Sequence, residues 1–356
     1  MARSHLRRVL ALFAVLLLTA GLAACGDDSA DDSSGSDADT TGDTTGAAEP
    51  SGETLTLGYS AWPGWFPLAV AEEAGIFEEN GLDVELRFFA DYLGSLDAMA
   101  AGEVDGNTQT LNDTMFSVAA GAEQTIVVVN DNSTGNDAII CDESVGSDIE
   151  DLEGLTIAAE PGVVDHFLLL LGLASVGLTE DDIEFRGVLT DAAAAGFADG
   201  EFDCVGVFAP FTLQALERPG SHVVFSSADF PGTIPDHIVV SPDLIAERPG
   251  DVQALVDSWY ATLDYIEANP EEALEILAAA AELSPEEYSE LAEGTTIFTA
   301  EEALEAFEDT EEPTSLSYTA ELINPFLVES GLTEEEAPLE GLFDASFTAD
   351  YVERNP

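Results

Sequence analysis

A short segment occurs twice in the chain, and this repeat limits the possible folds more than any other feature. "AAGEVDG" at residues 100–106 returns as "ADGEFDC" at residues 198–204, each time between a helical pattern and a strand. The order of elements upstream repeats too, so that residues 54–110 and 155–208 each read strand–helix–strand–helix–strand. Short apolar strands that alternate with helices predict parallel sheets with right-handed crossovers. We therefore expect an α/β fold with two β-α-β-α-β lobes.

Two further apolar strands flank the second copy of this series. "NDAIICD" and "DHIVVSP" are interpreted as the crossings between the lobes, which makes a two-strand hinge. This interpretation assigns residues 138–237 to lobe two, and residues 54–137 together with 238–356 to lobe one. From Asp251 onward the sequence is helical and rich in Glu and Ala, so the C-terminal helices are expected to brace lobe one.

The first part of the chain is predicted to lie outside the folded body. Residues 1–25 combine a basic start, an apolar run and "LAAC", which indicates a lipoprotein signal peptide with lipidation at Cys25. The pair Arg7 and Arg8 leaves general and twin-arginine export both open. Residues 26–53 contain no aromatic residue, Leu, Ile or Val, and predict a disordered acidic tether. We expect an exported protein, lipid-anchored to the outer face of the cytoplasmic membrane.

The charge of the chain excludes several classes of partner and chemistry. There are 72 acidic residues against 8 arginines, no lysine, and a formal net charge of −64. This charge disfavours nucleic acid and anionic lipid surfaces, and it suits a solvated surface in a salty exterior. The absence of lysine rules out a lysine Schiff base, and neither a nucleophile-elbow, a zinc-protease nor a phosphate-loop motif is present. We predict no catalytic residue, no cofactor and no metal.

Small molecules bind open parallel sheets beyond the carboxyl ends of the strands, where helices begin. Four segments qualify: "SAWPGW" and "TLNDT" in lobe one, and "EPGVVDH" and "FAPFT" in lobe two. Across a hinge they would form a cleft. The candidate ligand-binding residues in these segments and the hinge strands are Ser60, Trp62, Thr110, Asn112, Asp113, Asn136, Asp137, Asp165, His166, Phe208, Pro210 and Asp236.

Several of these candidates have a structural alternative. Trp62 is either a wall of the cleft or a buried anchor, whereas Trp65 is interpreted as an anchor on the following helix. Asn112, Asp113 and Asp165 precede or begin helices, where the same side chains would serve as caps.

The positions of the arginines bear on the charge of the ligand. The five arginines after the signal peptide fall in predicted strands, at helix ends and at the tail: Arg87, Arg186, Arg218, Arg248 and Arg354. The cleft therefore has no bidentate clamp for an anion, although backbone amides and hydroxyls could still hold nitrate or sulfonate. Aromatic rings with carboxylates favour a cation or a neutral amide, such as a guanidinium, an amine or a urea-like molecule.

Two cysteines remain after Cys25, namely Cys141 and Cys204. In an exported protein such a pair suggests one disulfide, and its spacing matches no metal motif. If Cys141 ends one strand and Cys204 starts its antiparallel neighbour, the two lie side by side. Two buried thiols are the alternative.

Several segments together resemble a known family. "GYSAWPGWFPLAVAEEAGIFEENGLDVEL", "AAGEVDG", "DLEGLTIAAEPG", "GEFDCVGVFAP" and "NPEEALEIL", over about residues 55–295, resemble the nitrate/sulfonate/taurine-type solute-binding lipoproteins of ABC importers. The resemblance implies a bilobal type II periplasmic-binding-protein fold that closes on a small ligand by hinge motion. It also implies delivery to ABC permease subunits with a cytoplasmic ATPase, by a protein expected to be monomeric.

The resemblance leaves the ligand open. The "GYSxWPGW" start and the "GND" turn resemble a branch associated with urea- or guanidine-like nitrogen compounds, while sulfonate, taurine, nitrate and a thiamine pyrimidine precursor are the alternatives. A receptor or scaffold without transport also stays open. The family shares its fold with a thiamine-pyrimidine synthase that depends on lysine chemistry, and the absence of lysine disfavours that enzyme here.

Overall fold

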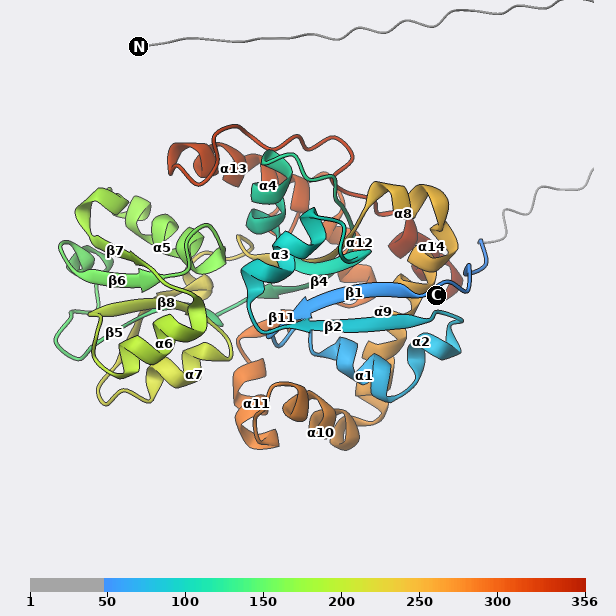
Figure 1. Ribbon diagram of the computed structural model, residues 1–356, viewed down its shortest axis with the longest axis horizontal. Coiled ribbons are helices and arrows are strands. Elements are labelled where there is room, and N and C mark those ends of the chain that lie inside the picture. Colours follow the sequence, from blue (N-terminus) through green and yellow to red (C-terminus); the bar gives the residue numbers. More distant parts are fainter. Residues whose placement is uncertain (1–47) are drawn as a thin grey trace, which may run out of the picture. The chain divides into compact units, whose positions relative to one another are not determined.

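A computed structural model describes residues 48–356 of the chain. The predicted signal peptide 1–25, the predicted lipidation site Cys25 and residues 26–47 of the predicted tether lie outside the described residues. The described residues belong to one compact unit whose strands and helices alternate along most of the chain (Figure 1). They form two separate mixed sheets, which confirms the predicted α/β fold with two lobes.

Lobe one is built on a six-stranded sheet in the order β11-β4-β10-β3-β1-β2. The strands are β1 (Leu55–Ser60), β2 (Val84–Phe89), β3 (Gly106–Thr110), β4 (Thr125–Ser133), β10 (Pro235–Val240) and β11 (Thr295–Ile297). β1 runs parallel to β2 and β3, whereas β10 lies antiparallel between β3 and β4. Helices α1 (Pro67–Glu73) and α2 (Ile76–Glu79) cover one face, and α3 (Tyr92–Ala100) and α4 (Leu111–Ala119) the other (Figure 1).

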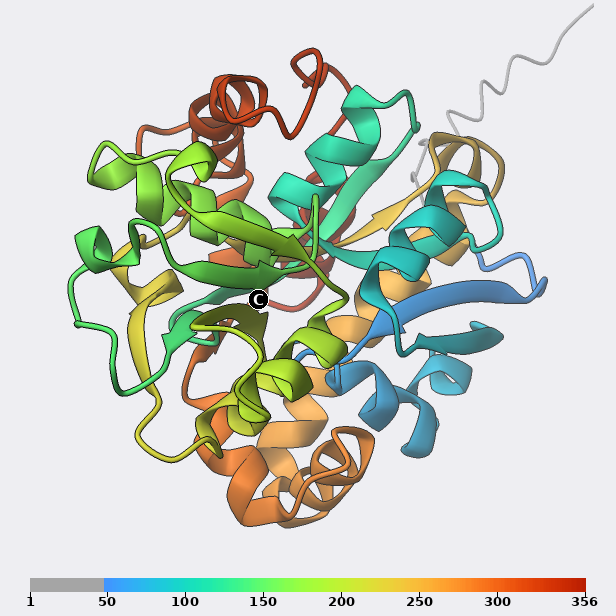
Figure 2. The same cartoon turned by 60° about the vertical axis from the view of Figure 1, so that its left-hand side comes forward.

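Lobe two is a smaller copy of the same design. Its sheet has the order β7-β6-β8-β5-β9. The strands are β5 (Asp137–Cys141), β6 (Thr156–Ala159), β7 (Glu184–Gly187), β8 (Cys204–Phe208) and β9 (His222–Ser226). Helix α5 (Val164–Ser175) lies on one face, while α6 (Thr190–Ala198) and α7 (Phe211–Leu216) lie on the other (Figures 1 and 2).

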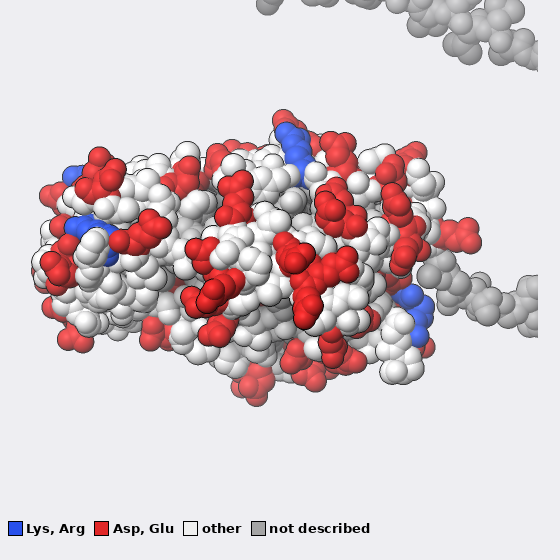
Figure 3. Space-filling view, turned by 90° about the horizontal axis from the view of Figure 1, so that it is seen from below, with Lys and Arg blue, Asp and Glu red and all other residues white. Residues whose placement is uncertain are grey.

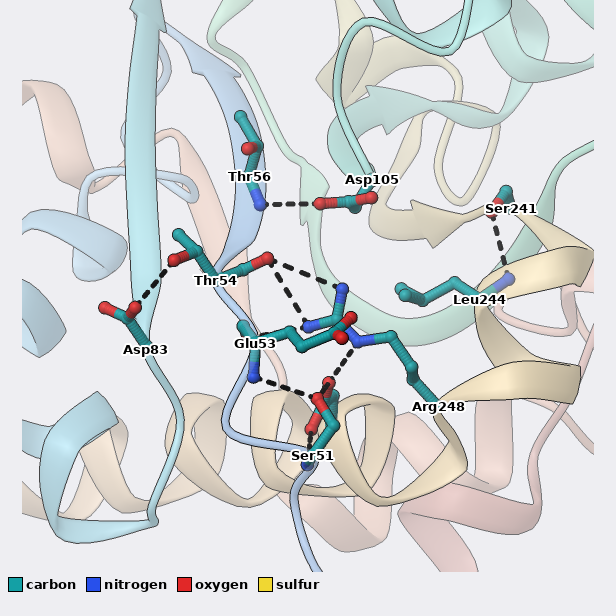
Figure 4. Close-up of polar contacts among 10 residues, drawn as sticks. Ser51, Glu53, Thr54, Thr56, Asp83, Asp105, Ser241, Leu244 and Arg248 are labelled. Atoms are coloured by element: carbon teal, nitrogen blue, oxygen red, sulfur yellow. Dashed lines mark hydrogen bonds and ion pairs between the residues drawn. The ribbon is translucent and has the colours of Figure 1, made fainter.

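The sequence repeat has the same structural role in both lobes. β1 lies between β3 and β2 as β6 lies between β8 and β7. In lobe one the backbone N–H of Thr56 donates to Asp105 Oδ2 over 2.8 Å, and in lobe two that of Thr156 donates to Asp203 Oδ2 over 2.8 Å. The aspartate of "GEVDG" and "GEFDC" therefore ties the start of the third strand to the central strand of each lobe; Figure 4 shows the contact in lobe one.

The chain enters the folded body earlier than predicted. The predicted tether ends at residue 53, but Ser51 donates from its backbone N–H and its hydroxyl to Asp251, over 2.5 and 2.6 Å. Asp251 is fully buried and pairs with Arg248, which also donates to the backbone oxygen of Glu53 over 2.8 Å (Figure 4). Residues 48–53 are apolar-poor but are held by these polar contacts, which the composition did not reveal.

The chain crosses between the sheets in two places. It leaves the first sheet after Ser133 and returns to it with Pro235. The lobe boundaries proposed from the sequence, after residues 137 and 237, therefore fall one residue inside β5 and three residues inside β10. The difference arises because β5 pairs only within the second sheet and β10 only within the first.

The C-terminal half contributes helices to lobe one and a bridge to lobe two. The helices are α8 (Pro242–Glu247), α9 (Pro249–Ala268), α10 (Pro270–Ala280), α11 (Pro285–Ala292), α12 (Ala300–Ala306), α13 (Leu316–Glu329) and α14 (Ser346–Arg354). α9, α12 and α14 pack on β4, as the bracing role requires. α13 packs on α4, and its Phe326 ring also meets Phe167 of α5 edge-on at 5.8 Å. Within residues 48–356 no helix has the length and apolar character to cross a membrane.

Cys141 and Cys204 occupy the positions expected from the strand pattern. They face each other at the paired ends of β5 and β8, with Cα atoms 4.1 Å apart, and their sulfur atoms are joined as a disulfide. The bond lies at the end of β5 opposite to Asp137. It therefore fastens the edge of lobe two away from the hinge.

Candidate functional site

A cavity lies where the carboxyl ends of the strands in the two lobes meet. Its volume is about 10 Å³, roughly the space of one water molecule, so the cleft is nearly closed in this structure. The residues that line it are Ala61, Trp62, Trp65, Tyr92, Thr110 and Asp236 from lobe one, and Asp137, Val164 and Phe208 from lobe two. Five of the twelve predicted ligand-binding residues are among them: Trp62, Thr110, Asp137, Phe208 and Asp236.

Aromatic rings form a continuous wall around this cavity. The Trp62 and Trp65 ring centroids are 6.3 Å apart, and those of Trp65 and Tyr92 are 5.4 Å apart. Tyr92 of lobe one meets Phe208 of lobe two edge-on at 5.9 Å, so the wall crosses the cleft. All four rings are at most 5% exposed. Trp62 thus serves as both wall and buried anchor, and Trp65, for which the sequence favoured the role of an anchor, lines the cavity as well.

The Pro-Gly turn between the two tryptophans is shaped to cover Asp131 of β4. Trp62 Nε1 donates to Asp131 Oδ1 over 3.0 Å. A Cβ atom at Gly64 would overlap the Asp131 carboxylate, so the turn needs a residue without a side chain at this position. The "WPGW" segment therefore places an indole donor and a bare backbone against one buried carboxylate.

Three aspartates gather at the base of the cavity. Asp131 of β4 and Asp236 of β10 are cross-strand partners, and Asp137 begins β5. Each is at most 1% exposed. Both oxygens of Asp236, Oδ2 of Asp131 and Oδ2 of Asp137 have no hydrogen-bond donor among the described residues. Burial raises the pKa of Asp131 and of Asp137 to about 7, and burial with the nearby Asp131 and Asp137 raises the pKa of Asp236 well above its usual range.

A second polar group surrounds the start of α4. The Thr110 hydroxyl lies 2.7 Å from Asp113 Oδ2 and 2.9 Å from Asn112 Oδ1, and Asn112 Nδ2 donates to Asp113 Oδ1 over 2.6 Å. The backbone N–H of Thr110 donates to the Tyr92 hydroxyl over 3.1 Å. Burial raises the pKa of Asp113 to about 7, although hydrogen bonds from Thr110 and Tyr92 oppose this. Asn112 and Asp113 thus hold Thr110 and Tyr92 in place instead of lining the cavity.

No positive side chain compensates these carboxylates within residues 48–356. All five described arginines pair with acidic residues outside the cavity: Arg87 with Glu103, Arg186 with Glu184, Arg218 with Asp142, Arg248 with Asp251, and Arg354 with Asp257 and Asp350. His237, next to Asp236 in β10, lies 2.8 Å from the Thr114 hydroxyl, and burial lowers its pKa to about 3. The histidine is therefore neutral.

The predicted residues at the start of α5 have structural roles. Asp165 accepts backbone N–H groups from Glu160 and His166, over 3.1 and 3.0 Å, and a hydroxyl from Thr190 over 3.2 Å. His166 accepts the backbone N–H of Gly162 at Nδ1, and its Nε2 lies 2.7 Å from Glu180. Burial lowers the pKa of His166, although Glu180 acts in the opposite direction. Neither side chain reaches the cavity lining.

The remaining predicted residues also lie away from the cavity lining. Asn136 donates to the backbone oxygen of Leu291 over 2.7 Å and to Thr295 Oγ1 over 2.9 Å, and so fastens the first crossing to lobe one. Ser60 ends β1 as a buried residue whose hydroxyl has no partner in the described part of the chain. Pro210 precedes α7 after a cis peptide bond.

Sequence reasoning missed Asp131 and Tyr92. Asp131 carried a signal, because it is a carboxylate inside the buried strand "TIVVVNDNS". Tyr92 opens α3 after a strand, which is the same position type as the predicted loops. Within residues 48–356 no three His, Cys, Asp or Glu side chains are placed to bind a metal ion.

The sequence also matches a family model. Residues 48–281 match the model described as the NMT1-like family. The chain belongs to the NMT1-like family. This NMT1-like chain is 28% identical over 214 residues to a Brucella abortus (strain 2308) protein named as a binding protein. The match covers 59% of the chain and 66% of that relative, so the chain spans just under two thirds of the relative's length. It is 27% identical over 226 residues to an Escherichia coli (strain K12) protein named for binding aliphatic sulfonates, covering 62% of the chain and 68% of that relative.

Solved structures support the fold of this NMT1-like protein. The alkanesulfonate-binding protein SsuA from Xanthomonas axonopodis pv. citri, bound to MOPS, superposes with a TM-score of 0.69 at 20% identity. The superposition covers 84% of the chain and all of SsuA. The periplasmic-binding-protein fold expected from the sequence is thereby confirmed.

Proposed function

We propose that the protein is an extracytoplasmic solute-binding protein of an ABC importer that captures a small organic nitrogen cation in its interlobe cleft. Family membership and the similarity to sulfonate-binding proteins support the receptor role. One observation carries the choice of ligand. Asp137 and Asp236 line an aromatic cavity as buried carboxylates, and no positive side chain accompanies them in the described part of the chain.

Electrostatics favour a cation over an anion in this cavity. A unit charge about 4 Å from a carboxylate gains or loses about 4 kcal/mol at an effective dielectric constant of about 20. A cation between Asp137 and Asp236 gains this energy, whereas a sulfonate or nitrate would lose it unless both carboxyls were protonated. Aromatic faces add cation–π attraction of about 0.5–2 kcal/mol. Unpartnered carboxylate oxygens accept the N–H donors of a guanidinium, an amine or a urea-like molecule.

An anion-binding protein and a thiamine-pyrimidine synthase-like enzyme are the alternative functions, and the residues of the cleft favour neither. A binding protein for sulfonate, taurine or nitrate would place its anion beside the carboxylates of Asp137 and Asp236. A thiamine-pyrimidine synthase-like enzyme would need a lysine, and the chain contains none. Because one fold carries many functions, the structural match alone cannot choose between receptor and enzyme.

The proposed function includes transfer of the ligand to a membrane permease and attachment of the protein to the membrane. The ligand would pass from the closed cleft to permease subunits that work with a cytoplasmic ATPase. A lipid on Cys25 would hold the protein at the outer face of the membrane, as a monomer. The residues proposed to contact ligand are Trp62, Trp65, Tyr92, Thr110, Asp137, Phe208 and Asp236.

Thermal unfolding of the purified protein with a panel of solutes tests this function. The panel contains guanidinium, methylammonium, urea, taurine, ethanesulfonate, nitrate and a thiamine pyrimidine, at constant high salt. A ligand at a hundredfold excess over its Kd should add about 2.7 kcal/mol to the free energy of unfolding. We expect stabilisation by guanidinium or methylammonium, and its loss in Asp236→Asn but not in Asp97→Asn, a surface change of equal charge in α3. Stabilisation by urea, ethanesulfonate or nitrate without stabilisation by a cation would refute the choice of ligand.

A further inference from the structure

Asp131 and Asp236 form a pair that is not explained by ligand binding alone. They are partners on the adjacent antiparallel strands β4 and β10, and they are 0% and 1% exposed. If both are ionised, three of their four oxygens have no hydrogen-bond donor within residues 48–356. Because the two residues are directly opposite each other on neighbouring strands, their side chains lie on the same face of the sheet, with Cβ atoms about 4.5–5.5 Å apart. Two carboxyl groups this close can bond to each other only when one of them carries a proton, because a carboxylate can accept but not donate.

The direction of the hydrogen bond follows from the neighbours of the pair. Asp131 Oδ1 already accepts a hydrogen bond from the Trp62 indole N–H, so Asp131 is the member of the pair whose ionised form is better stabilised. Asp236 has no other donor in the described part of the chain and is the better proton carrier. Burial raises the pKa of both aspartates, and the nearby Asp131 raises that of Asp236 further. Two close carboxyls that share one proton are a known outcome of like-charge repulsion.

Every titratable side chain that faces the pair from the surrounding elements is neutral or acidic. The titratable groups that face it are Tyr92 of α3, Asp113 of α4, Asp137 of β5, Tyr288 of α11 and, beside it in β10, the neutral His237. No arginine contacts these groups in the described residues. The proton is therefore the only positive charge that the described side chains at the base of the cavity can hold.

We propose that the cleft captures its cation in exchange for the proton shared by Asp131 and Asp236. The exchange rests on the proposed function, since it requires a cationic ligand that reaches Asp236. An N–H donor of the ligand replaces the O–H donor of Asp236, and the proton leaves to solvent. One positive charge enters and one leaves, so the net charge of the buried cluster is the same before and after binding.

The exchange gives the affinity a defined pH dependence. Where the pair holds one proton, each unit of falling pH makes the proton a tenfold stronger competitor, so Kd should increase about tenfold per unit as the pH falls towards 7. The increase should be steeper below pH 7, where Asp131 and Asp137 also bind protons. An anion that needs protonated carboxyls would show the opposite slope. The ligand would thus be held in neutral surroundings and released in acidic ones.

Calorimetry of the purified protein measures the exchange directly. Guanidinium and methylammonium chloride serve as probes at about pH 8, above the pKa of about 7 of Asp131 and Asp137, in two buffers that differ in ionisation enthalpy, at constant KCl. We expect about one proton released per cation bound. Cation binding without proton release and without pH dependence would overturn the exchange while leaving the proposed function intact. Failure of both cations to bind, with ethanesulfonate or nitrate binding instead, would overturn both.

A variant separates this pair from the other buried carboxyls. In Asp131→Asn the new amide can still accept the Trp62 indole and can donate to Asp236, so that no shared proton is needed. We expect cation binding to persist and proton release to fall towards zero, with Asp97→Asn as the control that keeps full release. Continued release of one proton from a folded Asp131→Asn protein would contradict the assignment to this pair. The proton count of the unaltered protein remains a test even if the variant does not fold.

Discussion

At the scale of single residues, Gly64 and Asp131 are fitted to each other. The turn in lobe one passes so close to β4 that a methyl group at Gly64 would occupy the place of the Asp131 carboxylate. The same turn supplies the Trp62 indole that Asp131 accepts. The absence of a side chain at position 64 thus determines where the buried carboxylate of Asp131 lies.

Gly64→Ala should therefore impair both stability and ligand binding. The added methyl displaces the Asp131 carboxylate and weakens its bond to Trp62, so we expect a loss of about 1–3 kcal/mol in the free energy of unfolding and at least a tenfold weaker cation affinity. Denaturant unfolding and calorimetry measure the two effects. Gly94→Ala in α3 is the matched control, because its methyl would meet only the exposed Asp91 side chain, at 3.3 Å. Equal behaviour of the two variants would disprove the close fit.

At the scale of secondary structure, the sequence predicts what is local and misses what is not. The repeat at residues 100–106 and 198–204 predicts both sheets because each copy closes its own series of neighbouring elements. The pairing of Asp131 with Asp236 joins residues far apart in the chain, and no local pattern indicates it. The contact of His166 is non-local in the same way, since its partner Glu180 comes from the turn beyond α5.

The strand ends also carry the cysteine pair, which we expect to stabilise lobe two. The bond joins residues 63 positions apart, and closing a loop of this length accounts for about 4 kcal/mol in the chain-entropy model. Replacing both cysteines by alanine should lower the free energy of unfolding by an amount of this order and leave cation affinity within about twofold, because Asp137 lies at the other end of β5. Two titratable thiols in the unfolded, unreduced protein would show that the disulfide is absent.

At the scale of the whole molecule, the acidic residues fall into two groups, one on the surface and one buried at the cleft. Acidic side chains are scattered over the surface with few basic ones between them, as the face in Figure 3 shows. Water and salt screen these charges. The carboxyls at the cleft are instead buried beside aromatic rings, so only bound protons or a bound cation can neutralise their charge. A sequence count of 72 acids cannot separate the two groups.

Buried carboxyls give the ligand-free protein an unusual pH profile. Burial raises the pKa of Asp113, Asp131 and Asp137 to about 7, so the folded state binds more protons than the unfolded state between about pH 4 and 7. The free energy of unfolding should therefore fall as pH rises through this range, by up to about 1.4 kcal/mol per pH unit for each group. Denaturant unfolding at several pH values, at constant high salt, measures the slope. Asp236→Asn should reduce it, whereas Asp97→Asn should not; a rise in stability from pH 4 to 7 would contradict the profile.

The way the chain enters the body has a mechanical consequence. Ser51 and Glu53 are fastened to Asp251 and Arg248 at the beginning of β1, and the six residues of β1 separate this point from the cleft by about 20 Å. A pull on the N-terminal segment would load α9 and the first sheet, with neither crossing between the lobes in the line of force. A force applied at Ser51 and Glu53 would thus leave the two crossings, and with them the cleft, unloaded.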